Sequence, residues 1–198
     1  RDTVINMLWA DSDLEKAQNY YKVVLNTLNS VLEPDRSSGQ NPFFIERRQD
    51  NYRINPKARI LVDTDLYLEY IKKGSRQTLE NAINLYEGRY FENCYVQEWL
   101  VVEQEYFHQK FLLAADQLIS IYLSKSEYEK ALNMTYVILN KDNLWESAYR
   151  SQMIIFDAMK RPSMIREVFQ QCQEVLTSQI DSPLSPETIE LFERLMAH

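Results

Sequence analysis

The chain has 198 residues and a formal net charge of −7, with 45% hydrophobic residues but only three glycines and six prolines. Few helix breakers and enough apolar residues for a core predict a mostly helical protein of one or two domains. This composition leaves no room for a glycine-rich phosphate loop, and no run of 18 apolar residues predicts a membrane span.

The negative charge is concentrated after residue 59. Residues 1–59 contain nine Lys and Arg against eight Asp and Glu, a net charge of +1. Residues 60–198 contain thirteen against twenty-one, a net charge of −8. An acidic surface repels phosphate, so any contact with nucleic acid is expected from the N-terminal part.

Two helices are expected at the start of the chain. DTVINMLWA places Val4, Ile5, Leu8 and Trp9 at helical spacing. A second helix is expected from about residue 14 to 32, with Ser12 or Asp13 as its N-cap and Pro34 ending it. Its apolar stripe consists of Leu14, Ala17, Tyr21, Val24, Leu25, Leu28 and Leu32.

A hairpin is expected next, after a loop rich in turn formers. FFIERR and YRIN flank a turn near residues 49–51, so the hairpin should span about 43–55. Short helix, long helix, loop and hairpin follow the order of the second half of a winged helix-turn-helix, in which the long helix enters the major groove. The same order also fits a helical pair with an ordinary hairpin beside it, and pattern alone favours this second interpretation.

The remaining sequence predicts a series of paired helices. We expect an extended stretch from residue 60, a helix capped by Thr64 or Asp65, a helix closed by Gly88, and a helix of about 28 residues at 97–125. Further helices are expected at 126–142, 144–160, 163–179 and 185–197. Ser126 with Glu129 fits a capping box, whereas Ser185 with Thr188 marks a helix start without one.

A weak repeat of 34 residues relates parts of this region. Tyr122 corresponds to Phe156, Ala131 to Ile165, and Ile138 to Cys172. This is the period of tetratricopeptide helix pairs. It predicts a short α-helical solenoid, an architecture that mostly binds other molecules rather than catalysing reactions.

Residues for catalysis or metal binding are sparse. His108 lacks partners at metal-ligand spacing and is expected to be a solvated or hydrogen-bonded helical residue, and His198 is terminal. Cys94 and Cys172 lack CxxC spacing and are expected to be small buried hydrophobes of a cytoplasmic protein. The aromatic residues on the helices, among them Tyr106, Phe107, Phe111 and Tyr122, are expected to pack in the core. We therefore expect no enzyme, cofactor or metal site.

Several phrases together resemble a known family. VDTDLY, LYEGRYFENCYVQEW, EYEKALNMTYVILNKDNLWESAYRSQM and SPETIELFERL are similar to the bacterial transcriptional activator domain, a tetratricopeptide-like module found beside an OmpR-type winged helix. INMLWADSDLEKAQNYYKVVLNTLNSVLEP and FFIERRQDNYRIN resemble the recognition helix and wing of that partner. The arrangement is similar to that of antibiotic-regulatory activators and related large regulators.

This resemblance implies two domains and a DNA-binding role. Residues 1–60 would be the C-terminal part of a winged helix-turn-helix, and residues 61–198 the helical activator domain, acting in self-association, signal reception or contact with the transcription machinery. The buried face of the long helix would comprise Ala17, Tyr21, Leu25, Leu28 and Leu32. Residues facing double-stranded DNA would be Lys22, Asn26, Thr27 and Asn29 on the helix, with Arg47, Arg48 and Arg53 on the wing.

The chain departs from the family at two points. Thr27, Asn29 and Ser30 stand where basic residues are common, which predicts weak binding to phosphate unless the wing compensates. The first strands and first helix of the winged fold are not found before Arg1, which would leave Val4, Leu8 and Trp9 partly uncovered. An alternative is therefore a protein-interaction module whose winged helix no longer binds DNA. A homodimer would suit paired half-sites, RNA polymerase or an upstream signalling domain are possible partners, and no membrane contact is expected.

Overall fold

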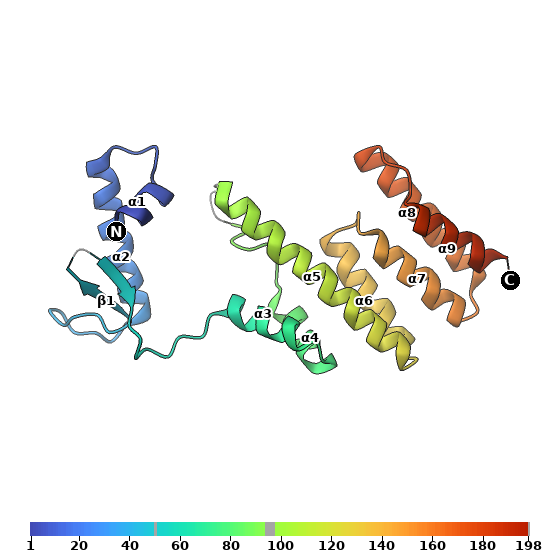
Figure 1. The fold of residues 1–198 in the computed structure, drawn as a ribbon, viewed down its shortest axis with the longest axis horizontal. Helices are drawn as coiled ribbons and strands as arrows, with labels where there is room; N and C mark the ends of the chain where they lie inside the picture. The colour runs from blue at the N-terminus through green and yellow to red at the C-terminus, as the bar shows by residue number, and fades with distance from the viewer. Residues whose placement is uncertain (50, 94–97, 198) are drawn as a thin grey trace. The chain divides into compact units, whose positions relative to one another are not determined.

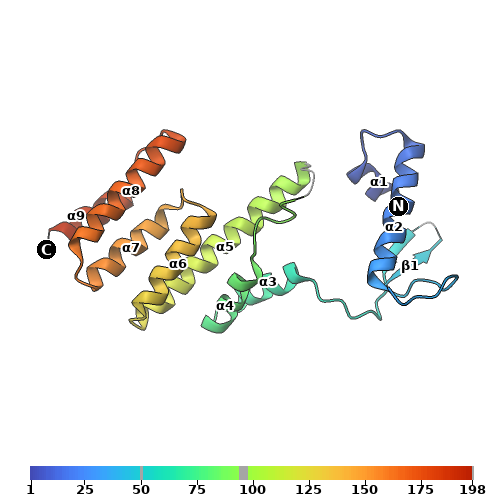
Figure 2. The ribbon, with the colours of Figure 1, turned by 180° about the vertical axis from the view of Figure 1, so that it is seen from behind.

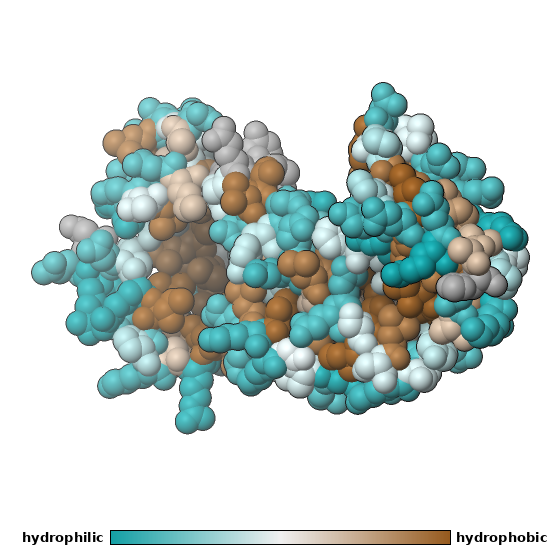
Figure 3. Space-filling view, turned by 45° about the vertical axis from the view of Figure 1, so that its right-hand side comes forward, coloured by the Kyte–Doolittle hydropathy of each residue, from teal (hydrophilic) through white to brown (hydrophobic). Residues whose placement is uncertain are grey.

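Helices dominate the structure, a computed structural model that describes residues 1–49, 51–93 and 98–197. The chain divides into two compact units, unit 1 (Arg1–Leu61) and unit 2 (Val62–His198) (Figure 1). Among the described residues, no helix combines the length and the apolar character needed to cross a membrane. Hydrophobic residues reach the surface at several places between hydrophilic ones (Figure 3).

Unit 1 consists of two helices and a hairpin. They are α1 (Asp2–Leu8), α2 (Leu14–Leu32), β1 (Ile45–Arg48) and β2 (Asn51–Ile54). The Asp13 carboxylate accepts hydrogen bonds from the backbone N–H groups of Glu15 and Lys16, at 3.0 and 3.4 Å. These groups have no partner inside the helix, so Asp13 is the N-cap, as expected. The helix ends at Leu32, and its C-cap Glu33 stands immediately before Pro34.

The core of unit 1 is small. Ile5, Ala17 and Tyr21 are buried, and Trp9, Leu25 and Tyr52 pack against them. The expected apolar stripe of α2 is wrong at three positions, because Leu14, Val24 and Leu28 are 64%, 48% and 42% exposed. The apolar arc of α2 is wider than the surface that the other elements of unit 1 cover.

Unit 2 is an array of helices in which each element packs against the next (Figures 1 and 2). The helices are α3 (Asp63–Lys73), α4 (Arg76–Leu85), α5 (Glu98–Ser124), α6 (Tyr128–Lys141), α7 (Glu146–Ala158), α8 (Pro162–Ile180) and α9 (Pro186–Met196). α5 also contacts α7, and α7 contacts α9. Contacts with the next helix and the next but one are what a stack of helix pairs requires.

The 34-residue repeat is confirmed by burial. Its first copy lies on α5 and α6 and its second on α7 and α8, and all six repeat residues, Tyr122, Ala131, Ile138, Phe156, Ile165 and Cys172, are buried. The equivalent positions therefore supply equivalent core contacts, although Ile165 replaces a small residue. Unit 2 is a tetratricopeptide-like helical bundle.

The expected ends of α3 and α4 are wrong. α3 starts at Asp63, one residue before Thr64, and its N-cap is Val62, whose side chain makes no capping hydrogen bond. α3 ends at Lys73, and its C-cap Gly74 adopts the left-handed conformation with φ 63° that glycine tolerates. α4 ends at Leu85, with Tyr86 as its C-cap, rather than at Gly88.

The expected capping box at Ser126 and Glu129 is also wrong. Ser126 lies in a turn with φ 57°, and α6 has Glu127, the next residue, as its N-cap. The Glu127 carboxylate does not cap the helix; it binds Arg76 on α4 at 2.6 Å and Lys130 on α6 at 2.7 Å. A tertiary ion pair has replaced the local cap. Ser185, in contrast, is the N-cap of α9 and marks its start as expected.

Arg76 connects three elements of unit 2. Its guanidinium also binds Glu80 at 2.9 Å and lies over the ring of Tyr122, 5.1 Å from the centroid. The Tyr122 hydroxyl donates to Glu80 at 2.9 Å. The hydrogen bond from Arg76 holds the pKa of Glu80 below its ordinary value, with a further contribution from Tyr122.

Candidate nucleic-acid interface

The polar residues that were expected to face DNA on α2 are mostly exposed. Lys22, Asn26 and Thr27 lie on the solvent side of the helix. Lys22 and Asn26 are four residues apart and therefore share one face. The Thr27 hydroxyl donates to the Val23 carbonyl at 3.0 Å, which leaves its oxygen lone pairs available as acceptors.

Asn29 does not belong to this exposed face. Its side chain is 5% exposed. It follows Ala17, Tyr21 and Leu25 at intervals of four residues, so it continues the inward stripe of the helix. The expectation that Asn29 faces a groove is therefore wrong for this structure. Exposed neighbours on α2 are partly apolar, because Val23 and Val31 are 62% and 71% exposed.

The hairpin divides its arginines between two faces. Arg47 pairs with Tyr52, whereas Arg53 pairs with Glu46. Directly paired residues point to the same side of a sheet, and successive residues point to opposite sides. Tyr52 packs edge-on against Tyr21 of α2 at 5.7 Å, so Arg47 lies on the side that faces α2. Arg53 lies on the opposite, outer side.

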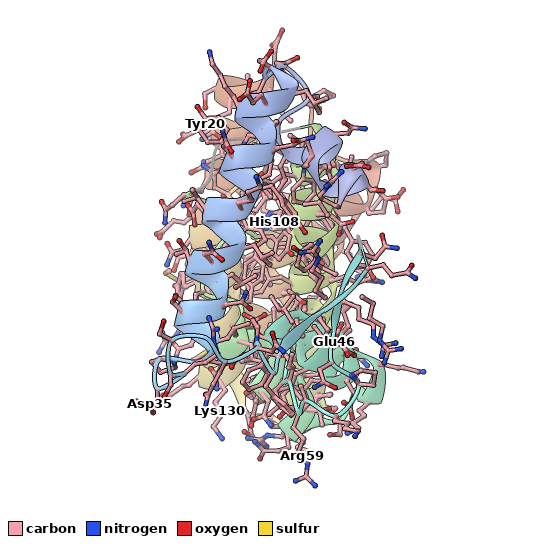
Figure 4. The ribbon with its side chains drawn as sticks, turned by 90° about the vertical axis from the view of Figure 1, so that its left-hand side faces the viewer. Tyr20, Asp35, Glu46, Arg59, His108 and Lys130 are labelled. Atoms are coloured by element: carbon pink, nitrogen blue, oxygen red, sulfur yellow. The ribbon has the colours of Figure 1, made fainter. Side chains whose placement is uncertain are left out.

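One carboxylate partly neutralises the outer side. Glu46 accepts a hydrogen bond from Arg53 Nε at 2.7 Å and lies 3.6 Å from Arg48 Nε (Figure 4). The hydrogen bond from Arg53 lowers the pKa of Glu46, so this group is ionised at neutral pH. Arg47 donates to the Gln49 carbonyl at 2.8 Å, at the turn. Asp50, also in the turn sequence, lies outside the described residues.

Further cations follow the hairpin. Lys57 and Arg59 are exposed in the segment between β2 and α3. The Arg59 side chain extends away from the ribbon in Figure 4. The sequence interpretation did not include these two residues, although the local charge balance had pointed to this part of the chain.

The position of the hairpin relative to α2 is fixed by Glu33, which the sequence interpretation also missed. Glu33 Oε1 accepts hydrogen bonds from the backbone N–H groups of Phe43 and Phe44, at 2.7 and 3.1 Å. Asn55 Nδ2 donates to the Phe43 carbonyl at 2.8 Å. The end of α2 and both ends of the hairpin are thus joined by side chain to backbone bonds. Such distant pairing has no local signal in sequence.

His108 is buried rather than solvated, at 2% exposed. Its Nδ1 lies 2.9 Å from the Tyr86 hydroxyl and its Nε2 lies 3.3 Å from Asp142. These contacts confirm a hydrogen-bonded helical histidine. No group of three His, Cys, Asp or Glu residues is placed to hold a metal ion within the described ranges. His198 lies outside them.

Cys172 behaves as a small core residue, as expected. It is fully buried on α8, and burial raises the pKa of its thiol to about 12. A thiol held protonated in this way is a poor nucleophile. Cys94 lies outside the described residues.

Comparison with solved structures identifies a similar fold. EmbR of Mycobacterium tuberculosis, in complex with a low affinity phosphopeptide, matches with a TM-score of 0.75 at 13% sequence identity. The match covers 99% of this chain and 54% of EmbR, so the chain spans about half the length of that protein. No curated protein sequence matches the chain.

Comparison with family profiles gives a match over most of unit 2. The bacterial transcriptional activator domain matches residues 71–196, which is more than half of the chain. The matched region runs from α3 to α9 and includes both copies of the repeat. The chain belongs to the bacterial transcriptional activator domain family.

Proposed function

We propose that the protein is a DNA-binding transcriptional regulator, in which unit 1 is the latter part of an OmpR-type winged helix-turn-helix. α2 would lie in the major groove and present Lys22, Asn26 and Thr27 to base edges and phosphates. The hairpin would act as the wing, with Arg47, Arg48 and Arg53 at the phosphate backbone. Unit 2 would act in self-association or in contacts with RNA polymerase or an upstream signalling domain.

One observation carries this proposal. In a chain of the transcriptional activator domain family, α2 exposes Lys22 and Asn26 on one face, and the hairpin joined to it by Glu33 carries three arginines. This is the arrangement that groove and backbone contacts require. The charge distribution agrees, because residues 1–59 have a net charge of +1 and the rest of the chain −8.

A second function is favoured by other features of unit 1. Glu46 offsets the charges of Arg48 and Arg53, and the exposed side of α2 carries Val23, Val24 and Val31. Apolar side chains on an exposed helix are typical of protein contacts. In this alternative, unit 1 is a platform for another protein and does not bind DNA.

Titration of the chain against random duplex DNA at several salt concentrations separates the two functions. For DNA binding, the logarithm of affinity should fall with the logarithm of salt concentration, by about 0.9 for each phosphate contacted. No binding even at low salt would contradict the proposal and support the protein platform.

Substitutions then test the assigned surfaces. Arg47→Ala with Arg48→Ala should weaken binding to every sequence and flatten the salt dependence, with a slope smaller by about 1 for each phosphate that the variant no longer binds. Asn26→Ala should instead relax sequence preference. The matched control is Arg166→Ala with Arg194→Ala, which removes two exposed arginines from unit 2. Equal effects of the two double variants would show that the hairpin is not a wing.

A further inference from the structure

An aromatic cavity of about 540 Å³ lies in unit 2. It is bordered by the start of α3, by the segment from the end of α4 to residue 91, and by α5. Five aromatic residues line it: Tyr67, Tyr86, Tyr90, Phe91 and Phe107. Its volume is in the range of small-ligand sites and is ample for one long side chain.

The rings are held in place by contacts with α5. The Tyr67 hydroxyl donates to the Phe107 carbonyl at 3.2 Å, and the Tyr86 hydroxyl bonds to His108 Nδ1 at 2.9 Å. Ring centroids of Tyr67 and Tyr86 are 6.2 Å apart, and those of Tyr90 and Phe107 are 5.0 Å apart. The aromatic lining is therefore largely formed before any ligand binds.

Phe91 is placed at the cavity at a conformational cost. It adopts φ 48°, a left-handed backbone conformation that is unfavourable for a bulky residue. Its ring packs against Tyr90 with centroids 4.5 Å apart, yet 52% of the residue remains exposed. A large apolar ring held at the surface in a strained conformation is more typical of a binding site than of a core.

Carboxylates accompany the aromatic lining. Asp63 and Glu87 line the cavity and both are exposed. Arg89 also lines it, but its guanidinium lies 3.6 Å from Glu105. Asp63 and Asp65 lie in the first turn of α3. Their negative charges counter the positive end of the helix dipole at the N-terminus of α3.

The wider surroundings are negative as well. Burial raises the pKa of Tyr90, and the charges of Glu103 and Asp63 raise it further. Burial is the main reason that the pKa of Tyr86 is raised to about 12. The charge of Arg89 lowers this pKa, and the charges of Glu92 and Glu105 raise it.

The second cation near the cavity is Lys141. Its ammonium group donates to the Glu87 carbonyl and lies 6.0 Å from the Tyr86 centroid. The carboxylates are Asp63, Glu87, Glu92, Glu103 and Glu105, against the two cations Arg89 and Lys141. This excess of negative charge favours a cation and disfavours a phosphate group.

The same unit already binds a guanidinium with these components. Arg76 lies over the ring of Tyr122 and is paired with Glu80 and Glu127. A cation over an aromatic face is attracted by the ring quadrupole, and a planar guanidinium can stack on a ring while its edge binds a carboxylate. The cavity offers both components, and its own cations already have partners: the Arg89 guanidinium lies beside Glu105, and Lys141 donates to the Glu87 carbonyl and lies over the Tyr86 ring.

We propose that the cavity binds the guanidinium group of an arginine side chain presented by a partner protein. The five rings would surround the guanidinium, and Asp63 and Glu87 would accept its hydrogen bonds. The inference rests on the proposed role of unit 2 in partner contacts and not on DNA binding by unit 1. It names the chemistry that the partner must present.

The test is a titration of the whole chain with a capped Gly-Arg-Gly tripeptide, followed by calorimetry or NMR. Counterparts with citrulline, lysine or phosphoserine in place of arginine are titrated in parallel. We expect the arginine peptide to bind with a Kd of about 1 mM or tighter. Citrulline has the shape of arginine without its charge, so it should bind at least about tenfold more weakly.

Two variants identify the site. Asp63→Asn with Glu87→Gln should weaken arginine binding by about tenfold while keeping the side-chain shapes. Phe91→Leu should weaken it by about threefold or more through loss of one ring. Their controls are Glu167→Gln with Glu190→Gln for the charges, and Tyr136→Leu for an exposed ring on α6. Circular dichroism checks that each variant is folded.

The outcomes are distinct. Failure of the arginine peptide to bind, equal binding of the citrulline or lysine peptide, or tighter binding of the phosphoserine peptide would overturn the inference. So would unchanged binding to both folded cavity variants. Duplex DNA binding measured on the same samples separates the two proposals: absence of DNA binding with arginine binding present contradicts the function of unit 1 alone, and the reverse contradicts the cavity alone.

Discussion

Glu46 is a single residue that reduces the positive charge of the hairpin surface formed by Arg48 and Arg53. It sits directly across the hairpin from Arg53 and also contacts Arg48, so two of the three hairpin arginines share its charge. Exposed ion pairs contribute little to stability, because solvent screens them. Their effect on binding is larger, since a carboxylate beside two cations opposes the approach of phosphate.

We therefore predict that Glu46→Gln strengthens DNA binding. Removing one negative charge from the outer side of the hairpin should increase affinity for duplex DNA by about threefold to tenfold at low salt, and less at high salt. Fluorescence anisotropy with a labelled random duplex measures this change. Glu190→Gln, which removes an exposed carboxylate from α9 in unit 2, is the control.

A decrease in affinity for Glu46→Gln would mean that Glu46 organises the arginines productively. An unchanged affinity would remove the hairpin from the DNA interface.

Residue-level expectations succeeded where a signal was local. Ser12 or Asp13 was expected as a cap because both precede a periodic apolar segment, and it is the Asp13 carboxylate that accepts hydrogen bonds from backbone N–H groups in the first turn of α2. Asn29 was misplaced because an amide on an otherwise apolar stripe was treated as a surface residue. The predicted cap at Ser126 was wrong because the N-cap is its neighbour Glu127. Glu127 is bound by Arg76, which lies 51 residues earlier in the sequence.

At the level of elements, one carboxylate of α7 binds the start of α9, beside hydrogen bonds from Arg150 to Ser185 and Thr188. Glu146 accepts hydrogen bonds from the backbone N–H and hydroxyl of Ser185, at 3.1 and 2.7 Å, and from the Thr188 hydroxyl at 2.6 Å. These donors lie at the start of α9, where backbone N–H groups lack helical partners. The carboxylate thus acts as a cap supplied by another helix.

Glu146 should also make stability depend on pH. Burial alone raises the pKa of Glu146, but the hydrogen bonds from Thr188 and Ser185, with the charge of Arg150, bring it below the ordinary 4.5. Because the folded-state pKa is the lower one, the carboxylate stabilises the fold above about pH 4.5, and this contribution is lost as the pH falls through the folded-state value.

We predict that Glu146→Gln lowers the free energy of unfolding by about 1–3 kcal/mol near neutral pH. The difference from the unmodified chain should shrink when both are unfolded with urea at about pH 3.5. Glu187→Gln, on the first turn of α9, is the control for the loss of a carboxylate from this region. If the difference in free energy of unfolding between Glu146→Gln and the unmodified chain is the same at both pH values, the ionised carboxylate is not its cause.

The helices themselves could be predicted from sequence, but their ends could not. Periodic apolar residues over ten or more positions indicate a helix, and every expected helix of unit 2 is present. Ends depend on single residues that face other elements. Gly74 closes α3 and Ser75 caps α4, whereas Gly88 was taken as the closing glycine.

The binding surfaces were harder to predict than the helices. The aromatic residues at the cavity, such as Tyr67 and Phe107, have the same spacing as core residues. They line a cavity only because of the conformation of the segment after α4. No local sequence pattern predicts that conformation. Tyr106 was expected in the core but is 44% exposed, next to the partly buried Phe107.

On the scale of the whole molecule, the chain consists of two units connected near residue 61. The segment between β2 and α3 contains the exposed residues Lys57 and Arg59, and Leu61 is 91% exposed. Exposed backbone outside regular structure is the preferred substrate of proteases. The strand before this segment and the helix after it, β2 and α3, hold their own backbone in hydrogen bonds.

We predict that limited trypsin digestion cleaves first after Lys57 or Arg59 and leaves unit 2 intact. Mass spectrometry of the early fragments identifies the site. Lys57→Gln with Arg59→Gln should delay this cleavage without changing later ones. First cuts within α5 to α8 would show that unit 2 opens more readily than its packing indicates.

The packing of each helix in unit 2 against the next, and the next but one, also bears on how the protein is made. Contacts between segments close in sequence cost little loop entropy, so topologies of this kind fold quickly. During synthesis from the N-terminus, α3, α4 and α5 can pack together before α8 and α9 exist. α9, which contacts α7 and α8, would join last. A ribosome that stalls midway through this unit would therefore hold an ordered but shorter stack. The apolar side of its last helix would be exposed, because the helix that covers it has not yet been made.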